Sequence, residues 1–96
     1  MSAGNYYVYI TTNPGKTLLY TGVTNDLRRR LSEHYKHRGD NKNFAGKYYC
    51  YKLVYYEYCM DINQAIGREK EIKDMSRKKK EELIATANSH WHFLVL

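Results

Sequence analysis

The stretch YTGVTNDLRRRLSEH, residues 20–34, decides how this 96-residue chain folds. A β-rich run ends at Gly22 and is followed directly by Thr-Asn-Asp. That order predicts a strand, a tight turn and a helix N-cap, with the helix running from about Asp26 to Arg38.

The helix that begins in this stretch has one buried stripe and one functional edge. At about 100° per residue, Leu27, Leu31 and Tyr35 form the buried stripe. Arg30 and His34 are four residues apart and therefore share a face at the edge of that stripe, above the end of the sheet. A phenol, a guanidinium and an imidazole are expected to converge there, which suits phosphate chemistry: Tyr20, Arg30 and His34.

The stretch is preceded by a predicted β-hairpin. Residues 6–12 alternate in polarity and predict a strand. The Asn-Pro-Gly-Lys sequence of residues 13–16 predicts a type II turn in which the glycine supplies the positive φ. Residues 17–23 form the return strand. If the register puts them on one face, Tyr9 and Tyr20 come close across the hairpin.

The middle of the chain predicts a loop and a third strand. Residues 39–47 are polar and contain two glycines, so they are expected to form a loop. This loop contains Lys42 and Lys47, and it is either a mobile nucleic-acid contact or a plain exposed connection. Residues 48–58 are rich in tyrosine and valine and predict the third strand.

A second helix is predicted from Asp61 to about Asp74. Asp61 and Gln64 match a capping box at its start. Its apolar positions are Ile62, Ala65, Ile66 and Ile72. Glu69 falls near the middle of that stripe, where a carboxylate is costly unless it is paired or binds a metal. Glu69 is therefore a candidate metal ligand, and a buried ion pair is the structural alternative.

A third helix is predicted over residues 77–87, with Ser76 as its N-cap. Its inward-facing residues are expected to be Leu83, Ile84 and Ala87. Lys78–Lys80 lie at its N-terminus, where the helix macrodipole disfavours cations. They either bind phosphate or form an ordinary solvated face. The apolar residues 93–96 are expected to dock on the body of the protein or on a partner.

Composition narrows the class of protein. The length predicts one domain, residues 1–96. A net charge of +6 favours a polyanionic partner, nucleic acid before an anionic membrane. Cys50 and Cys59 do not form a CxxC motif and are expected to be buried thiols in a reducing compartment. Without a signal peptide or a long apolar run, the sequence predicts a soluble cytoplasmic protein that does not enter the membrane.

Histidine pairs do not indicate a structural metal. His34 and His37, or His90 and His92, would suggest zinc, but no cysteine lies nearby in sequence and no set of four ligands is present.

Several short motifs, taken together, resemble the GIY-YIG nuclease superfamily. They are Tyr7-Val8-Tyr9, Tyr20-Thr21-Gly22, Arg30 ten residues after Tyr20, His34, Glu69 and Asn88. The chain most resembles the small bacterial single-domain members, which share the run Arg-Glu-Lys-Glu-Ile-Lys at 68–73 and the Asn-x-x-Trp ending at 88–91. The order and spacing of the motifs carry the resemblance, since each motif alone is weak.

The resemblance implies both a fold and an activity. The fold is α/β of the α+β type, with a three-stranded antiparallel sheet flanked by three or more helices. The activity is cleavage of DNA phosphodiester bonds with one divalent metal ion, and the superfamily includes homing and restriction endonucleases and an excision-repair subunit. Two positions depart from the pattern: Tyr7 replaces the first glycine and Thr21 replaces the second isoleucine. We expect Tyr7 to narrow the approach to the site and to alter substrate preference.

The resemblance also implies roles for three aromatic and imidazole groups. Tyr20 would be the general base or would orient it, with Arg30 lowering its pKa. Tyr9 would bind the nucleophile or the phosphate, and His34 would relay a proton. The alternatives are two ordinary sheet tyrosines and an idle surface histidine.

The remaining implied roles concern charge and the phosphate. Arg30 would bind the scissile phosphate through two N–H groups, a geometry that lysine cannot copy. Glu69 would hold Mg²⁺ or Mn²⁺ through one carboxylate, with waters and phosphate as the other ligands. Asn88 would hold a phosphate oxygen, or would serve only as an αL C-cap of the third helix.

We therefore predict a metal-dependent DNA endonuclease, with a possible role in DNA repair. The alternatives are a catalytically inactive nucleic-acid-binding module of the same fold and an interaction protein that uses its apolar tail. The expected state is a monomer or weak dimer, with a protein partner supplying targeting. The expected nucleic-acid-binding residues are Arg28, Arg29, Arg30, Lys78, Lys79 and Lys80.

Overall fold

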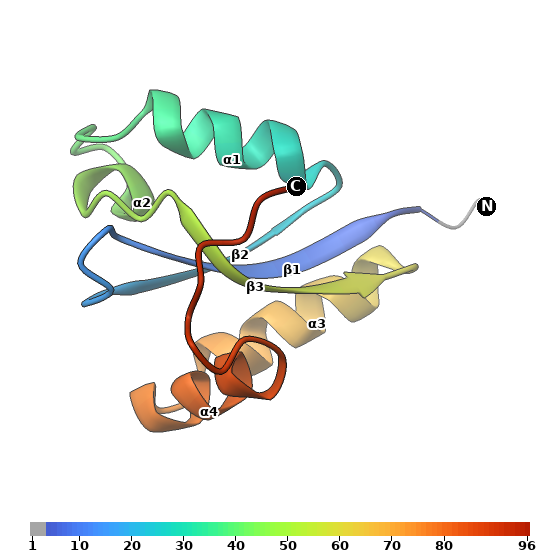
Figure 1. The fold of residues 1–96 in the computed structure, drawn as a ribbon. Helices are drawn as coiled ribbons and strands as arrows, with labels where there is room; N and C mark the ends of the chain where they lie inside the picture. The colour runs from blue at the N-terminus through green and yellow to red at the C-terminus, as the bar shows by residue number, and fades with distance from the viewer. Residues whose placement is uncertain (1–3) are drawn as a thin grey trace.

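A three-stranded antiparallel sheet forms the centre of the computed structural model, which describes residues 4–96 (Figure 1). Its strand order is β2-β1-β3, so the first strand of the chain lies in the middle. The strands are β1 (Tyr6–Thr12), β2 (Leu19–Thr24) and β3 (Lys52–Cys59). The helices are α1 (Leu27–Lys36), α2 (Phe44–Lys47), α3 (Ile62–Lys73) and α4 (Arg77–Ala87). The predicted α+β architecture is confirmed.

The helices cover the two faces of the sheet unequally. In Figure 1, α1 lies on one face, and α3 and α4 lie on the other. Because side chains alternate along a strand, β1 contributes to both cores. Val8 and Ile10 pack with Ile72 and Ile84 on the α3–α4 side, whereas Tyr9 packs on the α1 side. Residues Leu27, Leu31, Leu53, Leu94, Tyr7 and Tyr20 surround Tyr9 in that second core.

The three long helices begin where the sequence predicts. The Asp26 carboxylate accepts a hydrogen bond from the Arg29 backbone N–H at 3.0 Å, and Asp61 accepts one from Gln64 at 3.0 Å. Ser76 caps α4 in the same way. Each cap satisfies a backbone N–H group that has no partner inside its helix, which fixes the first residue of each helix.

The β1–β2 turn differs from the predicted type II turn. Positive φ occurs at Lys16 (59°) and not at Gly15. The side-chain oxygen of Asn13 accepts hydrogen bonds from the backbone N–H groups of Thr17 and Leu18 at 2.9 and 3.0 Å. These two bonds hold the chain in the turn, and as a result β2 begins at Leu19, two residues later than predicted.

The predicted loop at 39–47 contains a short helix. Asn43 caps it by accepting a hydrogen bond from the Gly46 N–H at 2.7 Å, so an asparagine read as a loop residue is an N-cap. After this helix Tyr49 has a φ of 58°. A left-handed residue cannot continue a strand, and β3 therefore begins at Lys52 and not at residue 48.

The inward faces of the helices are narrower than predicted. In α1, His34 is 4% exposed and Tyr35 is 52% exposed, because Tyr35 turns outward to stack on Tyr51. In α3 the buried residues are Ala65 and Ile72. In α4 Ile84 is buried, whereas the predicted inward residue Ala87 is exposed.

The C-terminal residues return to the sheet as predicted. They leave α4 on one face and cross the edge beside β3 toward α1 (Figure 1). The Leu94 N–H donates a hydrogen bond to the Leu53 carbonyl at 2.8 Å. Cys50 and Cys59 are free thiols, and Cys50 is buried. Within residues 4–96, no helix has both the length and the apolar character that crossing a membrane requires.

Candidate functional site

The site is built around Tyr9, a fully buried tyrosine in the middle of the central strand. Gly22 lies directly opposite Tyr9 in β2. A Cβ atom at position 22 would lie 2.6 Å from Cζ of the Tyr9 ring. The ring therefore lies across the backbone of β2, and only a glycine leaves room for it.

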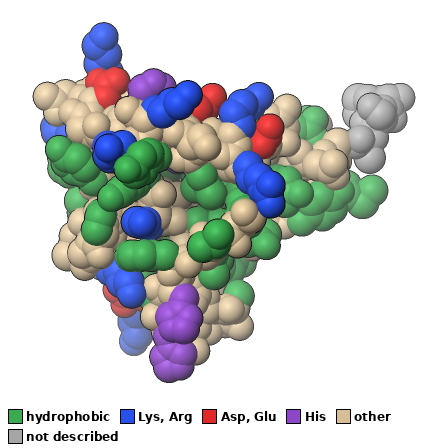
Figure 2. All heavy atoms as spheres, turned by 45° about the horizontal axis from the view of Figure 1, so that its top comes forward, with side chains coloured by type: hydrophobic (Ala, Val, Ile, Leu, Met, Phe, Trp, Pro, Cys, Tyr) green, Lys and Arg blue, Asp and Glu red, His purple; other side chains and the backbone are tan. Residues whose placement is uncertain are grey.

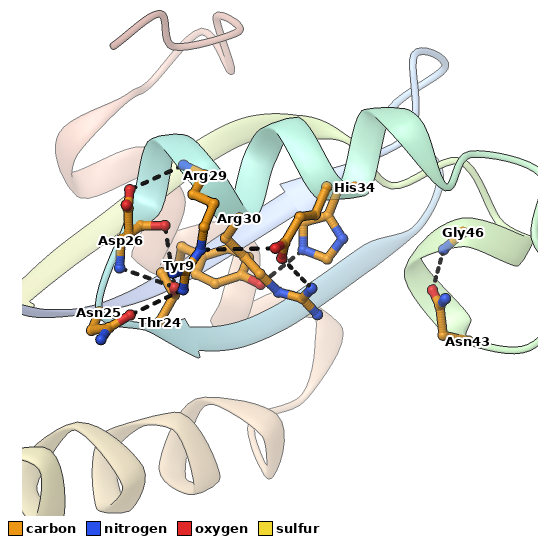
Figure 3. A network of polar contacts seen from close by, with 10 residues as sticks. Tyr9, Thr24, Asn25, Asp26, Arg29, Arg30, His34, Asn43 and Gly46 are labelled. Atoms are coloured by element: carbon orange, nitrogen blue, oxygen red, sulfur yellow. Dashed lines mark hydrogen bonds and ion pairs between the residues drawn. The ribbon is translucent and has the colours of Figure 1, made fainter.

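The Tyr9 hydroxyl is held by His34 of α1. Its Oη atom lies 2.8 Å from His34 Nε2 in a buried hydrogen bond, and Figure 3 shows the two side chains meeting beneath α1. Burial first, and the charge of Arg30 second, lower the pKa of His34 to about 4. Burial above all raises the pKa of the Tyr9 phenol, and the Tyr20 hydroxyl adds to this effect. Both groups are therefore neutral at pH 7.

Tyr20 completes an aromatic cluster over this pair. Its ring centroid lies 5.3 Å from that of His34, edge to face, and 6.3 Å from that of Tyr9. On its other side Tyr20 stacks on Phe44 of α2 at 6.2 Å. The sequence reasoning missed Phe44 because residues 39–47 were expected to be a loop. The Asn43 cap ahead of it was the available signal.

Arg30 extends over the same cluster from α1 (Figure 3). Its guanidinium Nη1 lies 3.1 Å from the carboxylate of Glu33, and its side chain is 36% exposed. Its positive charge lowers the pKa of His34 and opposes the rise in the pKa of Tyr9. Arg30 is thus close enough to act on both groups, and it remains partly open to a bound anion.

Glu69 approaches from α3, the helix on the opposite face of the sheet. Its side chain is only 17% exposed, and its carboxylate lies 3.4 Å from the ammonium group of Lys73, whose side chain is half exposed. Its negative charge contributes to the raised pKa of Tyr9. The structure therefore brings five of the predicted residues into electrostatic range of one another: Tyr9, Tyr20, Arg30, His34 and Glu69.

The donor set fits a hard cation held by a single carboxylate. No group of three or more His, Cys, Asp or Glu side chains that could hold a metal occurs in residues 4–96. This excludes, for those residues, a zinc-type cage built wholly from protein ligands. Mg²⁺ commonly uses one or two carboxylates together with water and substrate phosphate, which is what Glu69 offers.

Asn88 is not brought into this cluster. Its side-chain amide donates hydrogen bonds to the carbonyls of Val54 and His92, both at 2.9 Å, and its carbonyl accepts one from the His92 N–H. It ties the C-terminal segment to β3. The αL C-cap alternative is wrong, because Asn88 has a φ of −150°.

The predicted nucleic-acid-binding residues do not form one surface. Arg28 and Arg29 are exposed on α1, whereas Lys78–Lys80 lie at the start of α4 on the opposite face of the sheet (Figure 1). Tyr7, expected to narrow the site, has its ring edge to face with Tyr56 and Tyr58 of β3, at centroid distances of 6.2 and 5.7 Å. It thus lies on the β3 side of Tyr9, away from Tyr20.

Comparison with known proteins agrees with this arrangement. A family model described as the GIY-YIG catalytic domain matches residues 5–82. That range includes the five clustered residues and excludes Asn88.

Relatives match over most of their length. A UPF0213 protein of Natronomonas pharaonis is 37% identical over 83 residues, which cover 86% of this chain and 94% of that protein. A UPF0213 protein of Haloquadratum walsbyi is 38% identical over 81% of this chain and 84% of its own length. The solution NMR structure of a UPF0213 protein from Bacillus halodurans is similar, with a TM-score of 0.56 and 31% identity over 91% of this chain and 89% of that one.

Proposed function

Because this chain belongs to the GIY-YIG family and its relatives are UPF0213 proteins, we propose that it hydrolyses phosphodiester bonds in DNA with one divalent metal ion. The observation that carries this proposal is the buried hydrogen bond between Tyr9 and His34, with Arg30 over it. A structural role alone explains this bond less well, because neither group gains from burial unless a function requires it.

Arg30 binds the scissile phosphate in this proposal. Phosphoryl transfer depends mainly on positioning and on stabilising charge that develops on the phosphoryl oxygens. A guanidinium offers two parallel N–H donors to two of these oxygens. Glu33 occupies Nη1 of Arg30 and keeps the side chain oriented while other donors of the fork remain for the phosphate.

Tyr9 and His34 form the path for the proton. The neutral His34 Nε2 accepts the hydroxyl proton of Tyr9 as Tyr9 takes a proton from the attacking water, so a free phenolate is not required. A phosphate anion beside Arg30 offsets the positive charge that helps to lower the pKa of His34, which makes the imidazole a better base. Tyr20, packed against both rings, orients the pair.

Glu69 holds the metal ion. Bound there, the metal would supply Lewis-acid stabilisation of the phosphate and would activate water. The ion pair with the half-exposed Lys73 is a weak competitor, because exposed pairs of this spacing contribute only about 0.3–0.5 kcal/mol. We extend this assignment to DNA contacts by Arg28 and Arg29, which lie one turn from the cluster on α1.

The direct test is cleavage of labelled duplex, nicked, flapped and branched DNA with Mg²⁺ or Mn²⁺, beside an EDTA control. The Tyr9→Phe variant removes only the hydroxyl, and we expect it to lower the cleavage rate by about 10²–10⁴-fold. Tyr58→Phe is the matched control, because its hydroxyl bonds to Asn5 at the surface. Metal-dependent cutting that survives Tyr9→Phe would refute the proton path. DNA binding without cutting would favour an inactive binding module.

A further inference from the structure

A groove lies on the side of α1 that is turned away from the catalytic cluster. It has a volume of about 420 Å³ and runs between α1 and the C-terminal residues 93–96. Its lining includes Arg28 and Ser32 from α1 and Tyr51 and Lys52 from the start of β3. No aspartate or glutamate lines it. The groove is therefore basic and partly aromatic.

One wall of the groove continues into alternating basic and aromatic side chains. The Arg38 guanidinium lies 3.8 Å from the centroid of the Tyr35 ring. Tyr35 stacks on Tyr51 at 5.2 Å with 5° between the ring planes. The ammonium group of Lys52 lies 5.3 Å from the Tyr51 centroid.

The alternation extends to the C-terminal segment and the β1–β2 turn. Lys52 also lies 5.2 Å from the centroid of the Phe93 ring, and Lys16 lies 5.0 Å from the same centroid. Figure 2 shows basic and hydrophobic side chains intermixed on the left half of this face. We call this set the cation–aromatic ladder: Lys16, Phe93, Lys52, Tyr51, Tyr35 and Arg38.

The basic residues of the ladder are not used in ion pairs. Among residues 4–96, the ion pairs that form engage arginines and a lysine elsewhere, such as Arg68 with Glu57 and Arg77 with Glu81. Lys16, Arg38 and Lys52 take part in none of them. Three cations held against rings, without carboxylate partners, leave their charge for an external anion.

We infer that this groove and ladder bind single-stranded DNA; the choice of DNA rests on the proposed function. Surfaces that bind single strands combine a positive groove that follows the backbone with aromatic rings beside the bases. A cation already placed against a ring loses less conformational freedom when it meets a phosphate, so less of the binding free energy is spent on ordering it.

The position of the groove defines the class of substrate. Arg28 lines the groove, whereas Arg30 lies over the catalytic cluster, and residues two apart on a helix point about 200° from each other. The two surfaces are thus on opposite sides of α1. A strand held in the groove is separated by the width of a helix from the phosphate at Arg30. The substrate is therefore DNA that carries an unpaired arm beside the bond to be cut.

The test is a pair of matched triple variants, measured for binding without catalysis. Lys16→Gln, Arg38→Gln and Lys52→Gln together remove three charges from the ladder. Lys78→Gln, Lys79→Gln and Lys80→Gln together remove three charges across the sheet on α4. Binding of labelled single-stranded, duplex and tailed duplex DNA is measured by fluorescence anisotropy in EDTA at several salt concentrations, after melting curves confirm folding.

The ladder triple should lose affinity for single-stranded and tailed DNA selectively. The slope of log affinity against log salt should fall by about 0.7 per lost phosphate contact, while the α4 triple keeps the parental slope. Tyr35→Ala, which changes no charge at a half-exposed position, should weaken single-strand binding as well. Equal losses in both triples, or equal losses for single-stranded and duplex DNA, would overturn the inference. If the parent cuts no DNA and this selectivity persists, the proposed function fails and the groove assignment stands.

Discussion

Gly22 and Tyr9 face each other across the β1–β2 ladder, and the Tyr9 ring occupies the place where a Cβ atom of residue 22 would be. The glycine of the second name motif is thus required by the tyrosine of the first. A backbone without a side chain allows a fully buried phenol to reach His34.

Gly22→Ala should therefore destabilise the protein and displace Tyr9. Overpacking of this kind costs about 1–3 kcal/mol of unfolding free energy, and loss of the Tyr9–His34 bond should abolish cleavage. Gly67→Ala is the control, because a Cβ there meets no atom within 4 Å and replaces a glycine within α3. It should raise stability by about 0.5–1 kcal/mol. Urea unfolding of both variants checks the pair, and equal stabilities would contradict the close contact.

Stability should fall between pH 6.5 and pH 4 because of His34. The folded pKa is lowered to about 4 from 6.5, so the unfolded state binds more protons in this window. Stability from the neutral, buried imidazole is present above pH 6.5 and is lost as the pH falls through the folded value, by on the order of 3 kcal/mol.

The measurement is urea unfolding at a series of pH values, with His34→Gln and His37→Gln compared with the parent. The first variant should flatten the curve in this window, and the second, at an exposed position of the same helix, should not. An NMR titration of His34 near 6.5 would contradict the buried, neutral assignment.

Arg30→Lys should reduce cleavage much more than DNA binding. The charge is kept, but the planar fork that spans two phosphate oxygens is lost, and removing one such donor to a developing charge costs about 10²–10³ in rate. Arg29→Lys, one residue away and more exposed, is the control. Single-turnover cleavage and anisotropy on the same DNA separate the two effects. Parental cleavage by Arg30→Lys would make Arg30 an ordinary helix residue.

Glu69→Gln should leave metal-free stability almost unchanged. Its ion pair with Lys73 is half exposed on the lysine side, so removing the charge costs a few tenths of a kcal/mol. Cleavage should vanish, and the rise in melting temperature on adding Mg²⁺ should shrink. Glu81→Gln breaks an equally spaced pair with Arg77 and should keep both properties. A large metal-free loss in Glu69→Gln alone, with residual cutting, would make Glu69 structural.

Local chemistry made most of the fold predictable from sequence. Strand β1 follows from alternation, and the helix starts follow from Asp26, Asp61 and Ser76, because a cap is a contact within four residues. The β1–β2 turn was not predictable in detail, since the side chain of Asn13 binds two backbone N–H groups that the turn residues alone do not specify.

The site was predictable in membership more than in arrangement. Helical periodicity placed Arg30 and His34 on one face, but it assigned the buried position to Tyr35. The outcome depends on Tyr51, a partner from a distant segment that draws Tyr35 outward. Phe44 and Asn88 show the same limit, because the stacking of one and the hydrogen bonds of the other are tertiary contacts.

The placement of β1 in the middle of the sheet has a consequence for the order in which the chain is made. Tyr9, Tyr20, Arg30 and His34 all come from the first 34 residues, whereas Glu69 arrives on a helix that packs beneath the same strand. Synthesis delivers the N-terminal segments first. A nascent chain can therefore display the phosphate-binding half of its site while the carboxylate half is still untranslated. Until α3 emerges, it is a binder of polyanions without the residue assigned to hold its metal.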